Sequence, residues 1–288
     1  MFDVFKNRLE ISGKLSTVTA LRISYGRSTE PIGADLPVIK DAFDRPFIPG
    51  ASFKGALRSR LESFLRGIDI NLAEDPGNFT SLSRNQTIKN LKEEYQDDVA
   101  LTDELLKQTD LISRLFGSPW FASKFQVRDL TIVPDSWFGQ YQERDGVAID
   151  RDTETAADKQ LYNFQVVPSG SIFDVKIVVE NAKQWELGLL AIGLHQFESE
   201  QIPLGGGRSR GLGVVRLQID QMQWFDAEDD SGKLLTYLQN QVAGNMDEYE
   251  FQGEEIDYFK DEWTQALLSY LRCLIPEKSI ANTTSGEH

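Results

Sequence analysis

The chain has little of what several protein classes require. Its 288 residues include one cysteine, Cys273, and two histidines, His195 and His288. They are too few for a disulfide framework or a Cys/His zinc cluster, so we expect no zinc. No apolar run approaches the roughly 18 residues of a membrane span, so no membrane partner is expected. The first residues lack an apolar signal core, which makes the cytosol the expected location.

Basic residues are also scarce, with 30 against 45 acidic ones and a net charge of −15. Such a balance argues against a nucleic-acid partner, since phosphate binding needs Lys and Arg. The acidity is uneven, however, because residues 220–288 carry 15 acidic and 4 basic side chains. The near-neutral remainder can still form a local phosphate-binding groove, because only charges within about 8 to 10 Å act strongly. Net charge therefore does not decide the partner.

Hydrophobic periodicity predicts an α+β protein. A helix capped by Ser52 is indicated by Phe53, Leu57 and Leu61, and a second helix by the apolar residues of 185–199. Alternating patterns predict strands at 5–15, 21–25, 125–133, 161–167, 172–179 and 214–219. Pro168, Ser169 and Gly170 join 161–167 to 172–179 as the clearest hairpin. This order predicts an antiparallel sheet with helices on one face and a ferredoxin-like core.

The predicted organisation has a main domain, two additions to it and an extension. The main domain spans 1–219, with an insertion of short helices at about 68–112. A polar, turn-rich segment at about 134–159 is typical of an exposed hairpin or flap. Residues 27–49 form a long Gly- and Pro-rich loop, and loops of this length are usually functional. The acidic extension, 220–288, is expected to hold helices around 234–242 and 258–274.

The glycine-rich stretch at 205–213 is the strongest local signal for a ligand. It contains Gly205, Gly206, Gly207, Arg208, Ser209 and Arg210. Glycines cost chain entropy, so their density implies a close backbone approach, and the arginines indicate an anion. The stretch matches neither a P-loop nor a dinucleotide fingerprint. An RNA or DNA backbone fits it, and a flexible turn between helix and strand is the alternative.

The junction FIPGASFKGALRSRL offers a second anion site. Gly50 and Gly55 have P-loop spacing, but Ala56 and Leu57 replace the required Lys and Ser/Thr, which excludes nucleotide hydrolysis by that route. A helix N-terminus flanked by Lys54 and Arg58 remains, and such ends bind phosphate. The alternative is an ordinary amphipathic helix whose basic residues face solvent.

Asp35 is a third candidate functional residue. It lies on the long loop, where carboxylates usually form turns. Nearby Asp41 and Asp44 have basic neighbours, Lys40 and Arg45, and local ion pairing is sufficient to explain them. His195 is more consistent with packing or a surface role, so histidine acid/base chemistry is poorly supported.

Four segments together resemble a known family. They are IGADLPVIKDAFDRPFIPGASFKGALRSRLE at 32–62, LFGS at 115–118, RDGVAIDRDTETAADKQLYNFQVVPSGSIF at 144–173 and PLGGGRSRGLGVVRL at 203–217. They resemble the RAMP superfamily and, within it, the backbone subunits of type III CRISPR effector complexes. The resemblance implies an RRM-like fold whose thumb, about 134–162, inserts into the duplex of guide and target RNA. It also implies crRNA, target RNA and neighbouring effector subunits as partners.

The resemblance assigns roles to individual residues. Asp35 stands where the family's target-cleaving aspartate lies, and it could orient a ribose hydroxyl or contact a divalent cation such as Mg²⁺. The guide backbone would be held by Gly50, Ser52, Lys54, Arg58, Gly205, Gly206, Gly207, Arg208, Ser209 and Arg210. Arg128, Arg144 and Arg151 are further RNA-contact candidates. Two alternatives stay open: a catalytically silent crRNA-binding subunit, and a guide-processing endoribonuclease.

Overall fold

A five-stranded antiparallel sheet organises the protein. The computed structural model describes residues 4–24, 26, 34–149 and 156–275. The sheet order is β3-β7-β1-β8-β9, made of β1 (Asn7–Thr17), β3 (Phe125–Val127), β7 (Ile172–Glu180), β8 (Val215–Asp226) and β9 (Glu250–Phe251). None of the helices in the described part of the chain combines the length and apolar character needed to cross a bilayer.

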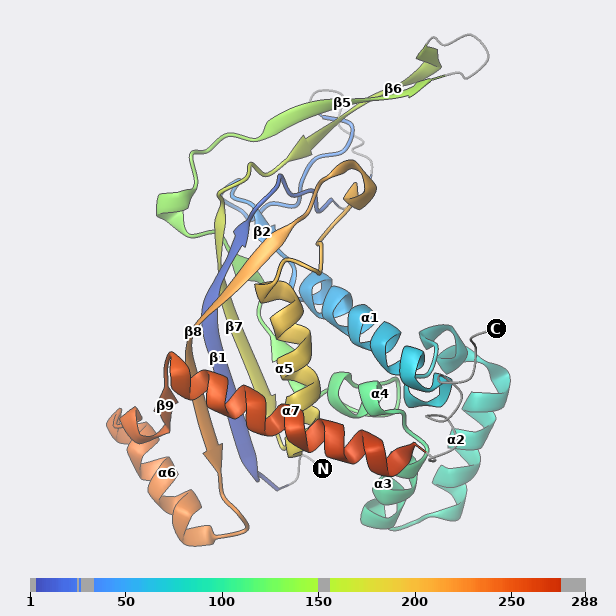
Figure 1. Ribbon diagram of the computed structural model, residues 1–288. Helices are drawn as coiled ribbons and strands as arrows, with labels where there is room; N and C mark the ends of the chain where they lie inside the picture. The colour runs from blue at the N-terminus through green and yellow to red at the C-terminus, as the bar shows by residue number, and fades with distance from the viewer. Residues whose placement is uncertain (1–3, 25, 27–33, 150–155, 276–288) are drawn as a thin grey trace, which may run out of the picture.

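The core follows a βαββαβ order. β1 leads through α1 (Gly50–Ile68) to β3, and β7 leads through α5 (Gln184–Glu198) to β8. The four strands lie in the order β3-β7-β1-β8, which is the ferredoxin-like arrangement. Both helices lie on one face of the sheet (Figure 1). The predicted α+β class and ferredoxin-like core are therefore confirmed.

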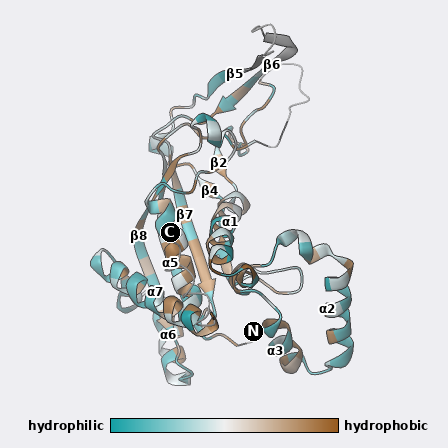
Figure 2. Ribbon diagram, turned by 45° about the vertical axis from the view of Figure 1, so that its right-hand side comes forward, coloured by the Kyte–Doolittle hydropathy of each residue, from teal (hydrophilic) through white to brown (hydrophobic). Residues whose placement is uncertain are grey.

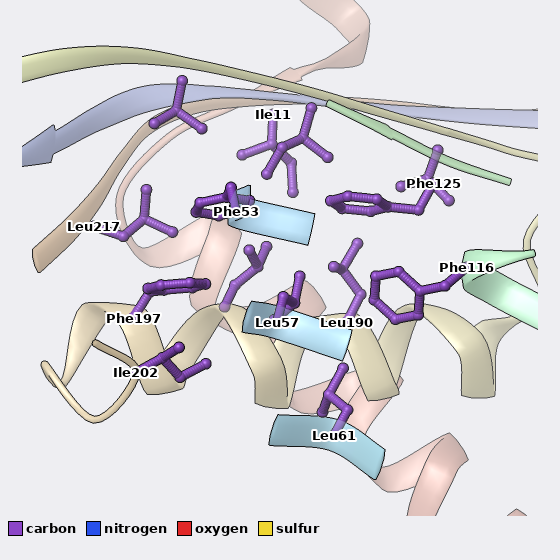
Figure 3. Close-up of a cluster of buried hydrophobic side chains, with 14 of the residues drawn as sticks. Ile11, Phe53, Leu57, Leu61, Phe116, Phe125, Leu190, Phe197, Ile202 and Leu217 are labelled. Carbon is purple, nitrogen blue, oxygen red and sulfur yellow. The ribbon is translucent and has the colours of Figure 1, made fainter. Parts of the chain in front are cut away.

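Alternation along β1 explains why one face of the sheet is covered. Leu9, Ile11 and Leu15 are buried, whereas the residues between them are partly exposed. Between sheet and helices, Phe53 of α1 stacks on Phe197 of α5 with ring centroids 4.5 Å apart (Figure 3). Burying such large apolar side chains stabilises the fold by roughly 1.5–3 kcal/mol each. The apolar face of α1 predicted from spacing is this core face.

The start of α1 differs from the prediction. The helix begins at Gly50 after Pro49, with no side-chain cap, so the prediction that Ser52 caps it is wrong. The N–H of Gly50 instead donates to Oδ1 of Asp129, at 2.8 Å. A carboxylate from a distant segment thus takes the place of a local cap.

A second, two-stranded sheet protrudes from one end of the molecule (Figure 1). It consists of β5 (Gln142–Ile149) and β6 (Ala156–Val166), which we call the thumb. The predicted hairpin between 161–167 and 172–179 is wrong. β6 pairs with β5, whereas β7 pairs with β1 and β3. The turn at 168–170 therefore redirects the chain from one sheet into another.

The segment 125–133 is also divided between two sheets. β3 joins the main sheet, whereas β4 (Leu130–Thr131) pairs with β2 (Phe47–Ile48) just before α1. The predicted single strand is therefore wrong. The 3₁₀ turn η3 (Pro134–Ser136) then leads toward the thumb.

Short helices fill the region of the predicted insertion. These are η1 (Ile70–Leu72), η2 (Pro76–Thr80), α2 (Leu82–Glu94), α3 (Asp98–Lys107) and α4 (Leu111–Phe116). Figure 2 shows α2 and α3 standing to the side of the sheet. Ile88, Leu91, Leu105 and Phe121 form a small cluster of their own there.

The acidic extension is joined closely to the core. β8 runs on to Asp226, so the predicted boundary between Ile219 and Asp220 falls inside a strand. The predicted helices are confirmed as α6 (Ser231–Ala243) and α7 (Glu254–Leu274), with η5 (Asp247–Tyr249) between them. α7 packs on α5 so closely that a Cβ at Gly188 would lie 2.0 Å from the carbonyl oxygen of Trp263.

Candidate functional site

The segment that carries Asp35 lies along the edge of β6. The N–H of Leu36 donates to the carbonyl of Asn163 at 3.2 Å, and the N–H of Gln165 donates to the carbonyl of Leu36 at 3.1 Å. This is a short parallel pairing of Leu36 with Phe164. Asp35 and Asn163 lie beside it and exchange two further hydrogen bonds. The candidate carboxylate is thus fixed at the edge of the thumb.

The glycine-rich loop approaches the same strand through Arg22. The N–H of Gly206 donates to the carbonyl of Arg22 at 2.9 Å. Gly205 has φ +75°, and a Cβ there would lie 2.1 Å from that carbonyl oxygen. The guanidinium of Arg22 lies over the ring of Phe164, 4.8 Å from its centroid. Here the need for glycine is steric, because no side chain fits between the two backbones.

Arg210 connects the loop to the thumb directly. It lies in η4 (Arg208–Arg210) and donates from Nη1 to the hydroxyl of Tyr162 at 3.0 Å. In the thumb register, Tyr162 is opposite Gly146 and Phe164 is opposite Arg144. Directly opposed residues point to the same face of a sheet. One thumb face therefore carries exposed Arg144, partly exposed Tyr162 and Phe164, which is buried beneath Arg22.

This arrangement can recognise nucleic acid by two kinds of contact. Guanidinium groups form forked, charge-assisted hydrogen bonds with phosphate. Aromatic rings on a strand provide stacking surfaces for unpaired bases. Arg208, Ser209 and Arg210 are exposed, and Arg22 is partly exposed. Arg144, Tyr162 and the loop arginines together form an RNA-compatible surface, and Asp35 is hydrogen-bonded to the same strand at Asn163.

The basic residues at the start of α1 have other partners. Lys54 donates from Nζ to Oγ of Ser123 at 2.8 Å, and burial, together with nearby Arg58, lowers the pKa of Lys54. Arg58 donates to Glu62, to the carbonyl of Gly117 and to Oγ of Ser113. Both side chains therefore bind the protein itself and form a structural joint between α1 and the segment 113–123.

The remaining predicted residues are spread over the molecule. Ser52 is partly exposed on α1, and Arg144 is exposed on β5. Arg128 is exposed after β3 and lines a groove with Lys14 and Asp174 on the sheet. Arg151 lies outside the described residues. The structure thus brings together Asp35, Arg144 and the glycine-rich loop, but not Arg128 or the α1 group.

The other acidic residues of the loop have local partners, as predicted, although the pairs are crossed. Lys40 pairs with Asp44 at 2.9 Å, and Arg45 pairs with Asp41 at 2.8 Å. Oδ1 of Asp41 also accepts the N–H groups of Phe43 and Arg45. These carboxylates stabilise a turn, so among the described residues of the loop Asp35 is the carboxylate that is hydrogen-bonded to the thumb.

A divalent cation fits this site only with help from a substrate. Among the described residues, no group of three or more His, Cys, Asp or Glu side chains is placed to hold a metal ion. Oδ2 of Asp35 accepts the N–H of Asn163, whereas Oδ1 has no hydrogen bond to any described residue. Mg²⁺ commonly uses one or two carboxylates together with phosphate oxygens and water. One carboxylate beside an RNA phosphate meets that requirement.

Three residues of this site were missed by the sequence analysis: Arg22, Tyr162 and Asn163. The strand patterns at 21–25 and 161–167 contained them, but alternation gives only the face of each residue. Arg22 belongs to the site through a tertiary contact, because its carbonyl accepts the N–H of Gly206 in the glycine-rich loop. The sequence does not indicate which distant segments lie side by side in this way.

Comparisons with known proteins identify a family and several relatives of this chain. The RAMP superfamily model matches residues 14–216. A relative named CRISPR system Cms endoribonuclease Csm3, from Enterococcus italicus, is 28% identical over 231 residues, covering 79% of this chain and 98% of the relative. A Csm3 of the same description from Methanocaldococcus jannaschii is 24% identical over 246 residues, covering 79% and 88%.

A third relative matches a shorter segment at a higher sequence identity. The Csm3 of Mycobacterium tuberculosis is 45% identical over 56 residues, which is 19% of this chain and 24% of that protein. The family match extends from β1 into β8 and includes α1, the thumb and the glycine-rich loop. Because it covers well over half of the sequence, this chain belongs to the RAMP superfamily.

Proposed function

We propose that this protein is a backbone subunit of a type III CRISPR ribonucleoprotein that binds guide crRNA and cleaves complementary target RNA at regular intervals. The observation that carries the proposal is the hydrogen-bonded attachment of Asp35 to the thumb, beside the arginine- and aromatic-bearing face. The relatives named as Cms endoribonucleases support the same activity.

The glycine-rich loop supplies the guide-binding part of the mechanism. Its backbone can approach a phosphate closely because Gly206 and Gly211 have open space where a side chain would be. Arg208 and Arg210 add positive charge at the same place, and Arg210 is oriented by Tyr162. These contacts read the RNA backbone rather than its sequence. Sequence recognition is left to base pairing between guide and target.

The thumb and Asp35 supply the cleaving part. The partly exposed ring of Tyr162 on the thumb can stack on a base that leaves the duplex. The carboxylate of Asp35 accepts the hydrogen bond, and then the proton, of the ribose 2′-hydroxyl, whose oxygen attacks the neighbouring phosphorus. The bond from that phosphorus to the 5′-oxygen breaks, which leaves a 2′,3′-cyclic phosphate and a 5′-hydroxyl that takes its proton from water. A bound Mg²⁺ would supply charge stabilisation at the phosphate. Arg22 and Arg210, which contact Phe164 and Tyr162 of β6, would hold the RNA backbone beside this strand.

The proposal is tested on the assembled particle. The protein is purified with its native neighbouring subunits, its RNA is extracted, and labelled RNA complementary to that guide is added with and without Mg²⁺. Cuts at regular spacing that disappear in Asp35→Ala, with the guide retained, are expected. Guide without cuts would identify a silent scaffold, and particles without RNA would contradict the proposed function. Cleavage of precursor repeat RNA by the isolated chain would indicate a guide-processing enzyme instead.

A further inference from the structure

We propose that Asn163 is a positioning residue that holds the Asp35 carboxylate in a fixed place beside β6 of the thumb. This inference rests on the proposed catalytic role of Asp35. It concerns a residue of β6 whose own side chain need not contact RNA.

Two reciprocal hydrogen bonds define the attachment. The N–H of Asp35 donates to Oδ1 of Asn163 at 2.6 Å, which fixes the backbone that carries the carboxylate. The N–H of Asn163 donates to Oδ2 of Asp35 at 3.1 Å, which fixes the carboxylate itself. The two residues are separated by 128 positions in sequence, so the pairing is a tertiary contact. Together these bonds restrict both the position and the rotation of the Asp35 side chain.

The neighbouring backbone makes the attachment part of the thumb. β6 pairs with β5 on one edge and with Leu36 on the other. The chain then joins the main body at Val38, which is buried in the main core, and at Ile39, whose N–H donates to the carbonyl of Ile23 at 2.8 Å. β6 is itself joined to the body at Val167, which exchanges two backbone hydrogen bonds with Leu21. Asp35 is therefore held on β6 where that strand meets the body.

The consequence is a link between duplex engagement and cleavage. A carboxylate on an independent loop would sample many positions, and misplacement by about 1 Å can cost roughly a hundredfold in rate. A carboxylate bound to β6 keeps a constant relation to the bases and phosphates that the thumb contacts. Asn163 thus acts through Asp35 and is a positioning residue, not a catalytic one.

Matched substitutions in the assembled particle test this role. Asn163→Leu keeps the size of the side chain but removes the oxygen that accepts the Asp35 N–H, while the backbone bond from residue 163 is retained. Asn163→Asp keeps an accepting oxygen at the same place. Gln142→Leu, at an exposed position on β5, is the control. Single-turnover cleavage, guide content and target affinity are measured for each particle, and amide hydrogen exchange is followed at Asp35 and Leu36.

We expect Asn163→Leu to reduce single-turnover cleavage about tenfold, with guide content and target affinity unchanged. Asn163→Asp should cleave faster than Asn163→Leu, and Gln142→Leu should match the wild type. Exchange at the Asp35 and Leu36 amides should accelerate in Asn163→Leu, while β1 and β7 stay protected, showing that the fold is intact. A wild-type rate in Asn163→Leu, or equal rates in the two Asn163 variants, would overturn the positioning role.

The same experiment separates this inference from the proposed function. If Asp35→Ala is inactive while Asn163→Leu cleaves normally, only the positioning role fails. If Asp35→Ala itself cleaves at the wild-type rate, the catalytic assignment fails, and the role of Asn163 fails with it.

Discussion

Two segments of this protein combine glycine with basic residues, and their surroundings differ. At the start of α1, Lys54 and Arg58 turn inward onto Ser123, Glu62 and the carbonyl of Gly117. In the glycine-rich loop, Arg208 and Arg210 are exposed on a tight backbone that lies against Arg22. The same residue types therefore form a structural joint in one place and an available surface in the other.

The difference lies in the acceptors that each segment meets. Around α1, a nearly buried carboxylate and several carbonyl oxygens lie within reach of the cations, and a buried polar group must be hydrogen-bonded. Around the loop, Arg210 has a tyrosine hydroxyl as its partner, and a hydroxyl leaves the charge of the guanidinium uncompensated. Composition alone cannot distinguish the two cases, because the acceptors come from distant parts of the sequence.

The largest effect is expected from Arg58→Ala. The side chain of Glu62 is only 7% exposed and would keep Arg66 as its one remaining ion-pair partner among the described residues. Removing one partner of such a buried pair should lower the free energy of unfolding by about 3 kcal/mol. Denaturant titration measures this, with Arg60→Ala on the same helix as a milder control. An unchanged unfolding midpoint combined with lost guide binding would mean that Arg58 of α1 binds RNA and is not structural.

A smaller effect on folding is expected inside the loop. Gly205→Ala would place a Cβ 2.1 Å from the carbonyl oxygen of Arg22 at a positive φ, whereas a Cβ at Gly206 meets nothing within 4 Å. We expect Gly205→Ala to cost about 2 kcal/mol and to reduce guide content, and Gly206→Ala to fold normally. Thermal unfolding and the RNA content of purified particles measure both. Equal behaviour of the two variants would contradict the close approach to Arg22.

The exposed loop arginines should affect binding rather than folding. Arg208→Ala combined with Arg210→Ala should weaken guide affinity roughly tenfold at low salt and make the remaining affinity less dependent on salt. The free energy of unfolding should change by less than about 0.5 kcal/mol. Filter binding over a salt series measures this, and Arg216→Ala, exposed on β8, is the control. Unchanged affinity would mean that the loop does not hold RNA.

The smallest effect is expected from Tyr162→Phe. This change keeps the ring beside Gly146 and removes only the hydroxyl that accepts from Arg210. One hydrogen bond to a charged group in a partly exposed setting should be worth about 1 kcal/mol or less. Guide affinity should therefore fall by about fivefold or less. If Tyr162→Phe is as damaging as the double arginine variant, Tyr162 itself contacts RNA.

Much of the fold follows from local sequence patterns. The alternation of β1 and the spacing of Phe53, Leu57 and Leu61 predicted the covered sheet face and the core face of α1. The errors arose where pairing partners are distant. Residues 161–167 and 172–179 are each strands, but their mutual pairing was wrong, because a short turn predicts a hairpin and gives no information about competing partners.

The candidate site was predicted in parts but not as a whole. Asp35 and the glycine-rich loop were both singled out, yet no sequence pattern indicated that β6 brings them together. Arg22 and Asn163 carry no local signature, because a carbonyl that accepts from a loop or an amide that holds a carboxylate is defined only by tertiary contacts. Lys54 and Arg58 fitted the pattern of a phosphate-binding helix N-terminus, but their side chains hydrogen-bond to other residues of the protein.

The most direct test of the account compares two aspartates of one loop. Asp35→Asn and Asp44→Asn each remove one negative charge, and asparagine tolerates the positive φ of 60° at position 44. Single-turnover cleavage of target RNA by guide-loaded particles is the measurement. We predict that the cleavage rate falls about a hundredfold in Asp35→Asn and stays at the wild-type value in Asp44→Asn. Equal rates in the two variants would contradict the claim that the carboxylate held on the thumb cuts RNA.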